Sequence, residues 1–214
     1  ALGVEVSALL EADADRVTLM RDMFQISYLC LMLALMIWAI RLALLTDEIL
    51  LWLFAAMQAA WITHNIIHFG YADVFIPIKA ADSLYMANRG LVILASILTT
   101  TFHRTMLARF APPRLSLMLL DALYLIYATS IILFFSKQFS LALGLNAIAI
   151  GVGPLLLLVN VFTARQNAPP GLLTLKVIYS LFNLALSSWV LIFAGLWQGS
   201  TYAQWALFTY GLAS

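Results

Sequence analysis

The chain has 214 residues, of which 64% are hydrophobic and only 10% charged, and its mean hydropathy is +0.99. Ordinary soluble domains are about 45–50% apolar and about 25% charged, so this composition indicates that lipid is the main solvent. The 11 basic and 10 acidic residues nearly cancel to a net charge of +1, and this balance argues against nucleic-acid binding. The single cysteine, Cys30, excludes an internal disulfide framework and any multi-cysteine metal site.

Residues 1–22 form an acidic leader, which we expect to be an extracytoplasmic linker from an upstream domain. The chain opens Ala1-Leu2-Gly3 without an initiator methionine, so it is predicted to be a segment of a longer protein. The leader lacks the basic stretch followed by a short apolar core that marks a signal peptide.

Six apolar runs are long enough to cross a bilayer, because about 20 helical residues at about 1.5 Å each span a hydrocarbon core of about 30 Å. The first three predicted helices cover residues 23–45, 49–71 and 83–103. The turn Thr46-Asp47-Glu48 has side chains that commonly cap helices, so it is predicted to cap the second helix. The third run contains one charge, Arg89.

The next three predicted helices cover residues 115–136, 139–163 and 172–197. The fourth contains Asp121, and the fifth is predicted to kink at Pro154. Small and polar residues at 198–201 are predicted to end the sixth helix, because glycine and hydroxyl residues interrupt helices. A seventh helix is predicted at 202–214, where only about 19 Å of helix fits, so the sequence stops inside that span.

These runs predict an all-α integral membrane protein with a seven-transmembrane helix bundle whose seventh helix is truncated. Basic residues in short loops favour a cytoplasmic location, and here they favour an N-terminus outside and a C-terminus in the cytoplasm. In that orientation the outer loops hold only Lys79 and Lys137. The inner side holds Arg41, Arg104, Arg109, Arg114, Arg165 and Lys176.

Charges inside a membrane helix are costly, which makes Arg89 and Asp121 the first candidates for function. The predicted topology places them at opposite depths, so they are not expected to pair. Asp121 is instead expected to reach His103, Arg104 or Lys176 and to form a structural or signalling charge contact there. For Arg89 three kinds of partner remain open: a lipid phosphate, a carboxylate of the outer loop (Asp73 or Asp82) or a ligand.

His64 and His68 stand four residues apart and therefore share one face of the second predicted helix. That spacing would let two imidazoles share a metal, but two ligands do not make a site. The third histidine, His103, is expected at the opposite depth. We therefore predict polar packing or a pH-sensitive contact, with no metal site and no cofactor.

Polar and aromatic residues gather near the predicted outer ends of the helices. Some of them are expected to form an outward-facing ligand pocket, although an aromatic belt with interhelical hydrogen bonds explains the same pattern. The candidate ligand-binding residues are His64, Asn65, His68, Asn88, Arg89 and Trp205. The same zone includes Gln25, Tyr28, Asn146, Trp197, Tyr202 and Gln204.

Several short segments carry a family resemblance, and they occur in a fixed order along the chain. They are Arg21-Asp22-Met23-Phe24-Gln25, Leu44-Leu45-Thr46-Asp47-Glu48-Ile49-Leu50-Leu51-Trp52, Phe69-Gly70-Tyr71, Phe75-Ile76-Pro77, the basic loop 104–114, Gly195-Leu196-Trp197 and Phe208-Thr209-Tyr210-Gly211. In this order of spans and loops, residues 17–214 resemble the membrane region of the bacterial seven-transmembrane receptors with diverse intracellular signalling modules.

The resemblance implies a periplasmic ligand-binding domain before this chain and a cytoplasmic output module after it, commonly a diguanylate cyclase or a histidine kinase. The expected function is therefore sensory signal transduction in the bacterial inner membrane, without catalysis by this domain. Expected partners are the lipid bilayer, a small ligand or periplasmic domain, the output module and a second copy in a homodimer. The alternatives are a transporter or channel segment that uses Arg89 and Asp121 and, less favoured by residue depth, an intramembrane metal enzyme.

Overall fold

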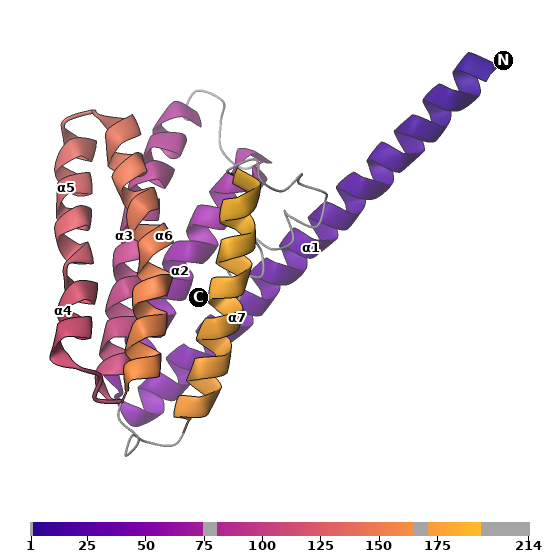
Figure 1. The fold of residues 1–214 in the computed structure, drawn as a ribbon. Helices are drawn as coiled ribbons and strands as arrows, with labels where there is room; N and C mark the ends of the chain where they lie inside the picture. The colour runs from indigo at the N-terminus through magenta and orange to yellow at the C-terminus, as the bar shows by residue number, and fades with distance from the viewer. Residues whose placement is uncertain (1, 75–80, 165–170, 194–214) are drawn as a thin grey trace.

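The computed structural model describes residues 2–74, 81–164 and 171–193 (Figure 1). Its elements are α1 (Leu2–Thr46), α2 (Ile49–His68), the 3-10 turn η1 (Tyr71–Val74), α3 (Ala81–Ala108), α4 (Arg114–Asp121), α5 (Leu123–Phe135), α6 (Phe139–Thr163) and α7 (Leu172–Phe193). The described part of the chain contains helices and no strands, which confirms the predicted all-α class.

Five helical stretches among the described residues are long and apolar enough to cross a membrane. They are Thr18–Thr46, Ile49–His68, Asp82–Ala108, Arg114–Phe135 and Phe139–Thr163. A shorter apolar stretch, Leu172–Leu184, lies in α7. Together these lengths and compositions support a multi-pass membrane bundle. The predicted seventh helix at 202–214 and the end of the sixth lie outside the described residues.

The helices run alternately up and down, so the bundle has two ends. One end, at the bottom of Figure 1, holds the α1–α2 and α3–α4 connections, the end of α6 and the start of α7, and we call it the Arg104 end. The other end holds η1, the start of α3 and the α5–α6 connection, and we call it the Asn88 end.

Two predicted helix ends differ from the structure. The second helix ends at His68 instead of residue 71, because Gly70 has φ +82 and turns the chain into η1. The third helix continues to Ala108 instead of stopping at residue 103. Its charged last turns leave the apolar zone without breaking the helix, and the pair Pro112-Pro113 follows the turn after it.

The fourth predicted span is divided at Ala122 into α4 and α5. The backbone of Ala122 is helical, with φ −62 and ψ −22, and its N–H donates to Met118 O at 2.9 Å. The N–H of Leu125 donates to Ala122 O at 3.1 Å, a three-residue spacing that tightens the helix locally. α4 and α5 therefore form one span, Arg114–Phe135, close to the predicted 115–136.

The predicted cap of the second helix is wrong. Glu48 occupies the N-cap position but makes no side-chain cap hydrogen bond. Its carboxylate pairs instead with Arg109, which follows α3, and so ties the α1–α2 turn to the α3–α4 turn. Thr46 Oγ1 donates to Leu42 O at 2.9 Å within α1. The Glu48 carboxylate thus forms an ion pair with Arg109 in place of a hydrogen bond to the first backbone N–H groups of α2.

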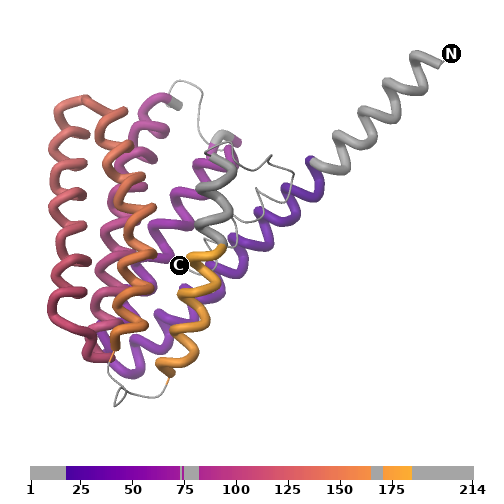
Figure 2. The backbone as a smooth tube through the Cα atoms, viewed as in Figure 1, coloured from indigo at the N-terminus to yellow at the C-terminus, as the bar shows by residue number. Residues whose placement is uncertain are grey.

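α1 packs chiefly against α2 and crosses it obliquely, as the described tube from residue 18 shows (Figure 2). Its outer face carries large apolar side chains; for example, Leu44 is 70% exposed and Leu45 75% exposed. Similar side chains cover the outside of the other helices, such as Leu125 and Phe135. A continuous apolar exterior suits lipid and would be a severe aggregation liability in water.

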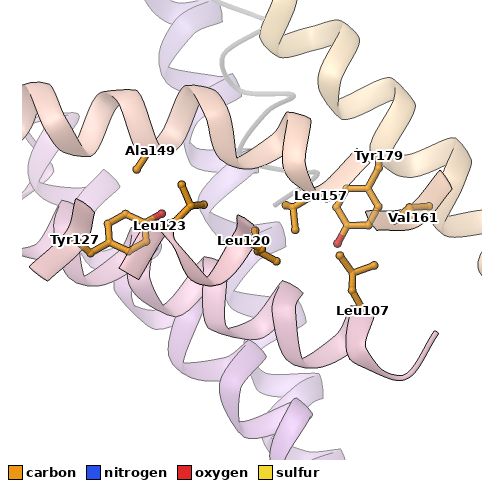
Figure 3. Close-up of a cluster of buried hydrophobic side chains, with 8 residues drawn as sticks. All are labelled: Leu107, Leu120, Leu123, Tyr127, Ala149, Leu157, Val161 and Tyr179. Carbon is orange, nitrogen blue, oxygen red and sulfur yellow. The ribbon is translucent and has the colours of Figure 1, made fainter. Parts of the chain in front are cut away.

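The hydrophobic core lies between α3, α4, α5, α6 and α7 (Figure 3). α6 is central to it, because it packs against each of the other four helices. The core extends from Tyr127 beside Ala149 to Tyr179 beside Val161, with Leu157 between them. α2 contacts α3 on the other side, and so α3 belongs to both halves of the bundle.

Candidate functional site

A polar contact between α2 and α3 lies at the Asn88 end. His64 Nδ1 is 2.9 Å from Asn88 Oδ1. The amide oxygen only accepts, so Nδ1 carries the proton, and Nε2 of the neutral ring is left as an acceptor. Asn88 is only 7% exposed, and this hydrogen bond satisfies its buried amide oxygen.

Two further hydrogen bonds extend this contact to α1 and η1. Asn65 Nδ2 donates to the hydroxyl of Tyr28 at 3.4 Å, and the hydroxyl of Tyr71 donates to Gln25 Oε1 at 3.3 Å. Both distances are long, so each bond is weak and can be rearranged at low cost. We call these residues and their neighbours the polar cluster. It consists of Gln25, Tyr28, His64, Asn65, His68, Tyr71 and Asn88.

Aromatic rings line one edge of the polar cluster. The rings of His64 and His68 stack at 5.5 Å between centroids with 15° between their planes, as their four-residue spacing predicts. Trp61 meets His64 edge-on at 5.6 Å, and its Nε1 donates to Thr99 Oγ1 of α3 at 2.8 Å. The ring of Phe69 contacts the exposed ring of His68 on one side and the ring of Tyr71 on the other, and so connects α2 to η1. The cluster thus combines hydrogen-bonding groups with flat apolar surfaces.

Tyr71 lies in η1, outside the helices that are long enough to span a membrane. Partial burial raises the pKa of its phenol above the ordinary value. The charge of Asp22 raises this pKa further, while Arg21 opposes the shift. Tyr71 therefore keeps its proton at neutral pH and remains the donor to Gln25.

The polar cluster consists of hydrogen-bonding side chains and includes no carboxylate, lysine or arginine. No group of three histidine, cysteine or carboxylate side chains gathers anywhere in the described part of the chain. His103, the third histidine, lies 15 residues along α3 from Asn88 and hydrogen-bonds elsewhere. The arrangement therefore fits recognition of a polar, hydrogen-bonding group better than metal chemistry.

Two other predicted members of the outer zone, Arg89 and Asn146, make no described hydrogen bond to this network. Arg89 is exposed, and its guanidinium carbon lies 5.9 Å from the ring centroid of Phe139 on α6. Asn146 is buried in α6, and its Oδ1 has no hydrogen-bond partner among the described residues. Trp205 lies outside the described residues, as do Trp197, Tyr202 and Gln204.

Asp121 meets one of its three expected partners at the Arg104 end. Arg104 Nε and Nη2 donate to the two carboxylate oxygens of Asp121 at 2.8 and 3.1 Å, a two-pronged geometry that fixes both side chains. Lys176 does not take part, because its Nζ lies 5.5 Å from the ring centroid of Phe162. The structure thus brings together Arg104 and Asp121 and separates Lys176 from them.

A contact that the sequence did not indicate joins α3 to α7. His103 Nδ1 is 2.5 Å from the hydroxyl of Tyr179, although the two residues are 76 positions apart. Asn183 Nδ2, one turn further along α7, donates to Pro154 O of α6 at 3.0 Å. The only sequence signal was a single tyrosine in the apolar run of the sixth predicted span, at a depth similar to that of His103.

Comparison of this chain with protein-family models, with curated proteins and with solved structures gives no match.

Proposed function

We propose that the chain is a sensory signal-transduction domain that relays a periplasmic or intramembrane stimulus to a cytoplasmic output module. In this proposal the polar cluster receives the stimulus and the Arg104 end delivers it. The proposed orientation is N-terminus outside, in the inner membrane of a bacterium. The domain itself carries out no chemistry, and the output module following it would be a diguanylate cyclase or a histidine kinase.

The observation that carries the proposal is the position of α3. This one helix holds Asn88 in the polar cluster and, 15 and 16 residues later, His103 and Arg104. At about 1.5 Å per residue, the two groups lie about 24 Å apart along one helix. A small rotation or shift of α3 would therefore alter polar contacts at both ends of the bundle together.

Weak contacts at the receiving end suit such a relay. The hydrogen bonds from α1 and η1 are 3.3 and 3.4 Å long, whereas the Arg104–Asp121 contacts are 2.8 and 3.1 Å. A ligand shifts a bundle only by binding one arrangement more tightly than another, and about 1–3 kcal/mol of coupling is sufficient. A polar ligand that replaces the two long bonds could supply that difference.

The proposed partners follow from the same arrangement. Lipid surrounds the apolar outer face, and a small polar ligand or a periplasmic domain would contact the polar cluster. α7 begins at the Arg104 end and is tied to α3 through Tyr179. Movement of α3 would therefore reach α7, which precedes in sequence the predicted seventh helix that would lead to the output module. A homodimer would suit outputs that work in pairs.

Transport receives less support from this geometry. The alternative is a transporter or channel segment in which Arg89 and Asp121 are gating or substrate charges. Asp121 is occupied by Arg104, while Arg89 lies on the outside of α3 beside Phe139. The two charges thus have separate surroundings at opposite ends of the bundle.

A labelling experiment tests the relay. Thr174 is exposed near the start of α7, so Thr174→Cys in a Cys30→Ser background reports on the Arg104 end. We expect His64→Ala to change the maleimide labelling rate of that cysteine by at least about fivefold in lipid vesicles, because coupling of 1–3 kcal/mol corresponds to about 5–150-fold. The matched control is Thr63→Ala, whose exposed side chain bonds only within α2.

An equal labelling rate in the parent, His64→Ala and Asn88→Ala proteins would show that the two ends are independent and would contradict the relay. Vesicle swelling in small charged and neutral solutes separates this function from transport. Swelling that requires the protein and disappears in Arg89→Ala would favour the transporter or channel instead.

A further inference from the structure

A small, partly open cavity of about 30 Å³ lies among the helices, between the polar cluster and the Arg104 end. Residues of α2, α3, α4, α5, α6 and α7 line it. Figure 3 shows four of these residues, Leu120, Tyr127, Ala149 and Leu157. The wall is not wholly apolar, since α3 supplies Ser96, Thr99, Thr100 and His103. An interior space of about 10–15 Å³ is enough for one water molecule, so this cavity has room for about two.

His103 brings an unsatisfied polar atom to the cavity. Its side chain is 4% exposed, Nδ1 is used by Tyr179, and Nε2 has no hydrogen-bond partner among the described residues. In one neutral tautomer Nε2 is a donor, and in the other it is an acceptor. Water satisfies either tautomer because it can both donate and accept.

Pro154 creates a second unsatisfied group in the same wall. Proline has no N–H, so the carbonyl of Ile150, four residues earlier in α6, lacks its helical donor. Ile150 and Pro154 both line the cavity. Insertion of water into a helix at such a gap is a known cause of helix bending. An acceptor on α6 and an unpaired nitrogen on α3 therefore border one space.

We propose that this cavity is an internal water-binding site, in which one or two water molecules bridge His103 Nε2 of α3 and the carbonyl of Ile150 on α6. Two hydroxyls supply further acceptors. Ser96 Oγ donates to Val92 O and keeps its lone pairs free to accept, and Thr100 Oγ1 shares a hydrogen bond of 2.8 Å with the hydroxyl of Tyr127. A bridging water thus finds the two to four polar partners that stable internal water requires.

The size and chemistry of the cavity select water over other occupants. Pockets for organic ligands are about 300–1,000 Å³, far larger than this space. Among the described residues of its wall there is no carboxylate, lysine or arginine to balance an ion. Water binding in this cavity follows from packing and hydrogen bonding alone and does not require that the domain transmit a signal.

Gly153 allows the site to be filled. A Cβ added there would meet only Leu123 Cδ1, at 3.7 Å, so an alanine methyl would enter the cavity without a clash. The matched control is Gly144→Ala on the same helix, where an added Cβ meets nothing within 4 Å and where the backbone gains the same helix propensity. Both variants are expected to fold.

The first measurement is magnetisation transfer from water to the imidazole of His103 in ¹⁵N-histidine-labelled protein in lipid vesicles, with His103→Gln to assign the signal. We expect transfer in the parent protein and in Gly144→Ala, and its loss in Gly153→Ala. Absence of transfer in the parent protein would show a dry cavity and overturn the proposal.

The second measurement is the melting temperature of the same variants. If water occupies the site, Gly153→Ala expels it without replacing its hydrogen bonds, so the melting temperature rises less than in Gly144→Ala or falls. In an empty cavity the new methyl would gain contacts instead, and Gly153→Ala would be at least as stabilising as Gly144→Ala. That order would also overturn the proposal.

Discussion

Asn160 joins two helices through a single buried side chain. It is 1% exposed, its Nδ2 donates to Ser116 O at 3.1 Å, and its Oδ1 accepts from Ser116 Oγ at 3.0 Å. Ser116 lies in the first turn of α4, and Asn160 lies in the last turn of α6. Asn160 therefore fastens the start of α4 to the end of α6.

Replacing Asn160 with leucine is expected to lower the free energy of unfolding by about 1–2 kcal/mol, because the Ser116 hydroxyl loses its interhelical partner inside the bundle. Thr163→Ala is the control, since Thr163 is exposed and its strongest hydrogen bond, to Val159 O, stays within α6. Thermal unfolding in detergent micelles measures both. Equal melting temperatures for the two variants would show that the Asn160 contact contributes little.

Arg104 and Asp121 show how depth restricts the partners of a charged residue. The predicted depths of Arg89 and Asp121 in the membrane excluded an ion pair between them, and in the structure Asp121 forms its ion pair with Arg104. The depth of a residue does not predict whether Arg104 or Lys176 pairs with Asp121, because both lie at the same end of the bundle. That choice depends on how each helix is rotated, and here Lys176 faces Phe162.

Among the elements, α3 and α5 approach closely at Gly90. A Cβ added to Gly90 would lie 3.3 Å from Phe134 Cζ, so the absence of a side chain allows this ring to pack against the backbone of α3. Small residues have the same role at many helix contacts in membranes.

We expect Gly90→Val to lower the free energy of unfolding by about 1–3 kcal/mol, because the valine would push Phe134 out of its position. Gly144→Val controls for the β-branched residue in a helix, since the space around Gly144 is open. Unfolding of both variants by heat in micelles is the measurement. A Gly90→Val protein as stable as Gly144→Val would contradict close packing of α3 on α5.

The spans could be predicted from the sequence because lipid imposes a length on every apolar run. The fifth predicted helix, 139–163, has the same limits as α6. Helix ends were harder to predict where the cause is local. Gly70 ends α2 early, and α3 continues past the apolar zone to Ala108 because a helix does not need to stop where the lipid does.

The candidate site could be predicted only in part. Four-residue spacing placed His64 beside His68, and the predicted polar zone contained every member of the cluster except Tyr71, which the turn at Gly70 brings to Gln25. Asn88 and Arg89 are neighbours in sequence but have different surroundings, one against His64 and the other against Phe139. Helices with apolar residues on every side give no hydrophobic stripe from which their rotation could be predicted.

In the whole molecule, the two ends differ in the contacts that join separate segments. The Arg104 end has the ion pairs Arg104–Asp121 and Glu48–Arg109, whereas the Asn88 end has the hydrogen bonds of the polar cluster. α3 connects the two ends, and α7 is tied to it by the contact of His103 with Tyr179. A relay across a membrane requires that a bilayer separate these two ends.

Labelling of two single cysteines with a membrane-impermeant maleimide in intact bacterial cells tests this requirement most directly. In a Cys30→Ser background, Lys137→Cys marks the exposed α5–α6 turn, and Ala111→Cys marks the exposed α3–α4 turn. We expect Lys137→Cys to react from outside the cells and Ala111→Cys to react only after the cells are opened. Reaction of both cysteines from the same side would contradict a membrane-spanning helix between residues 114 and 135.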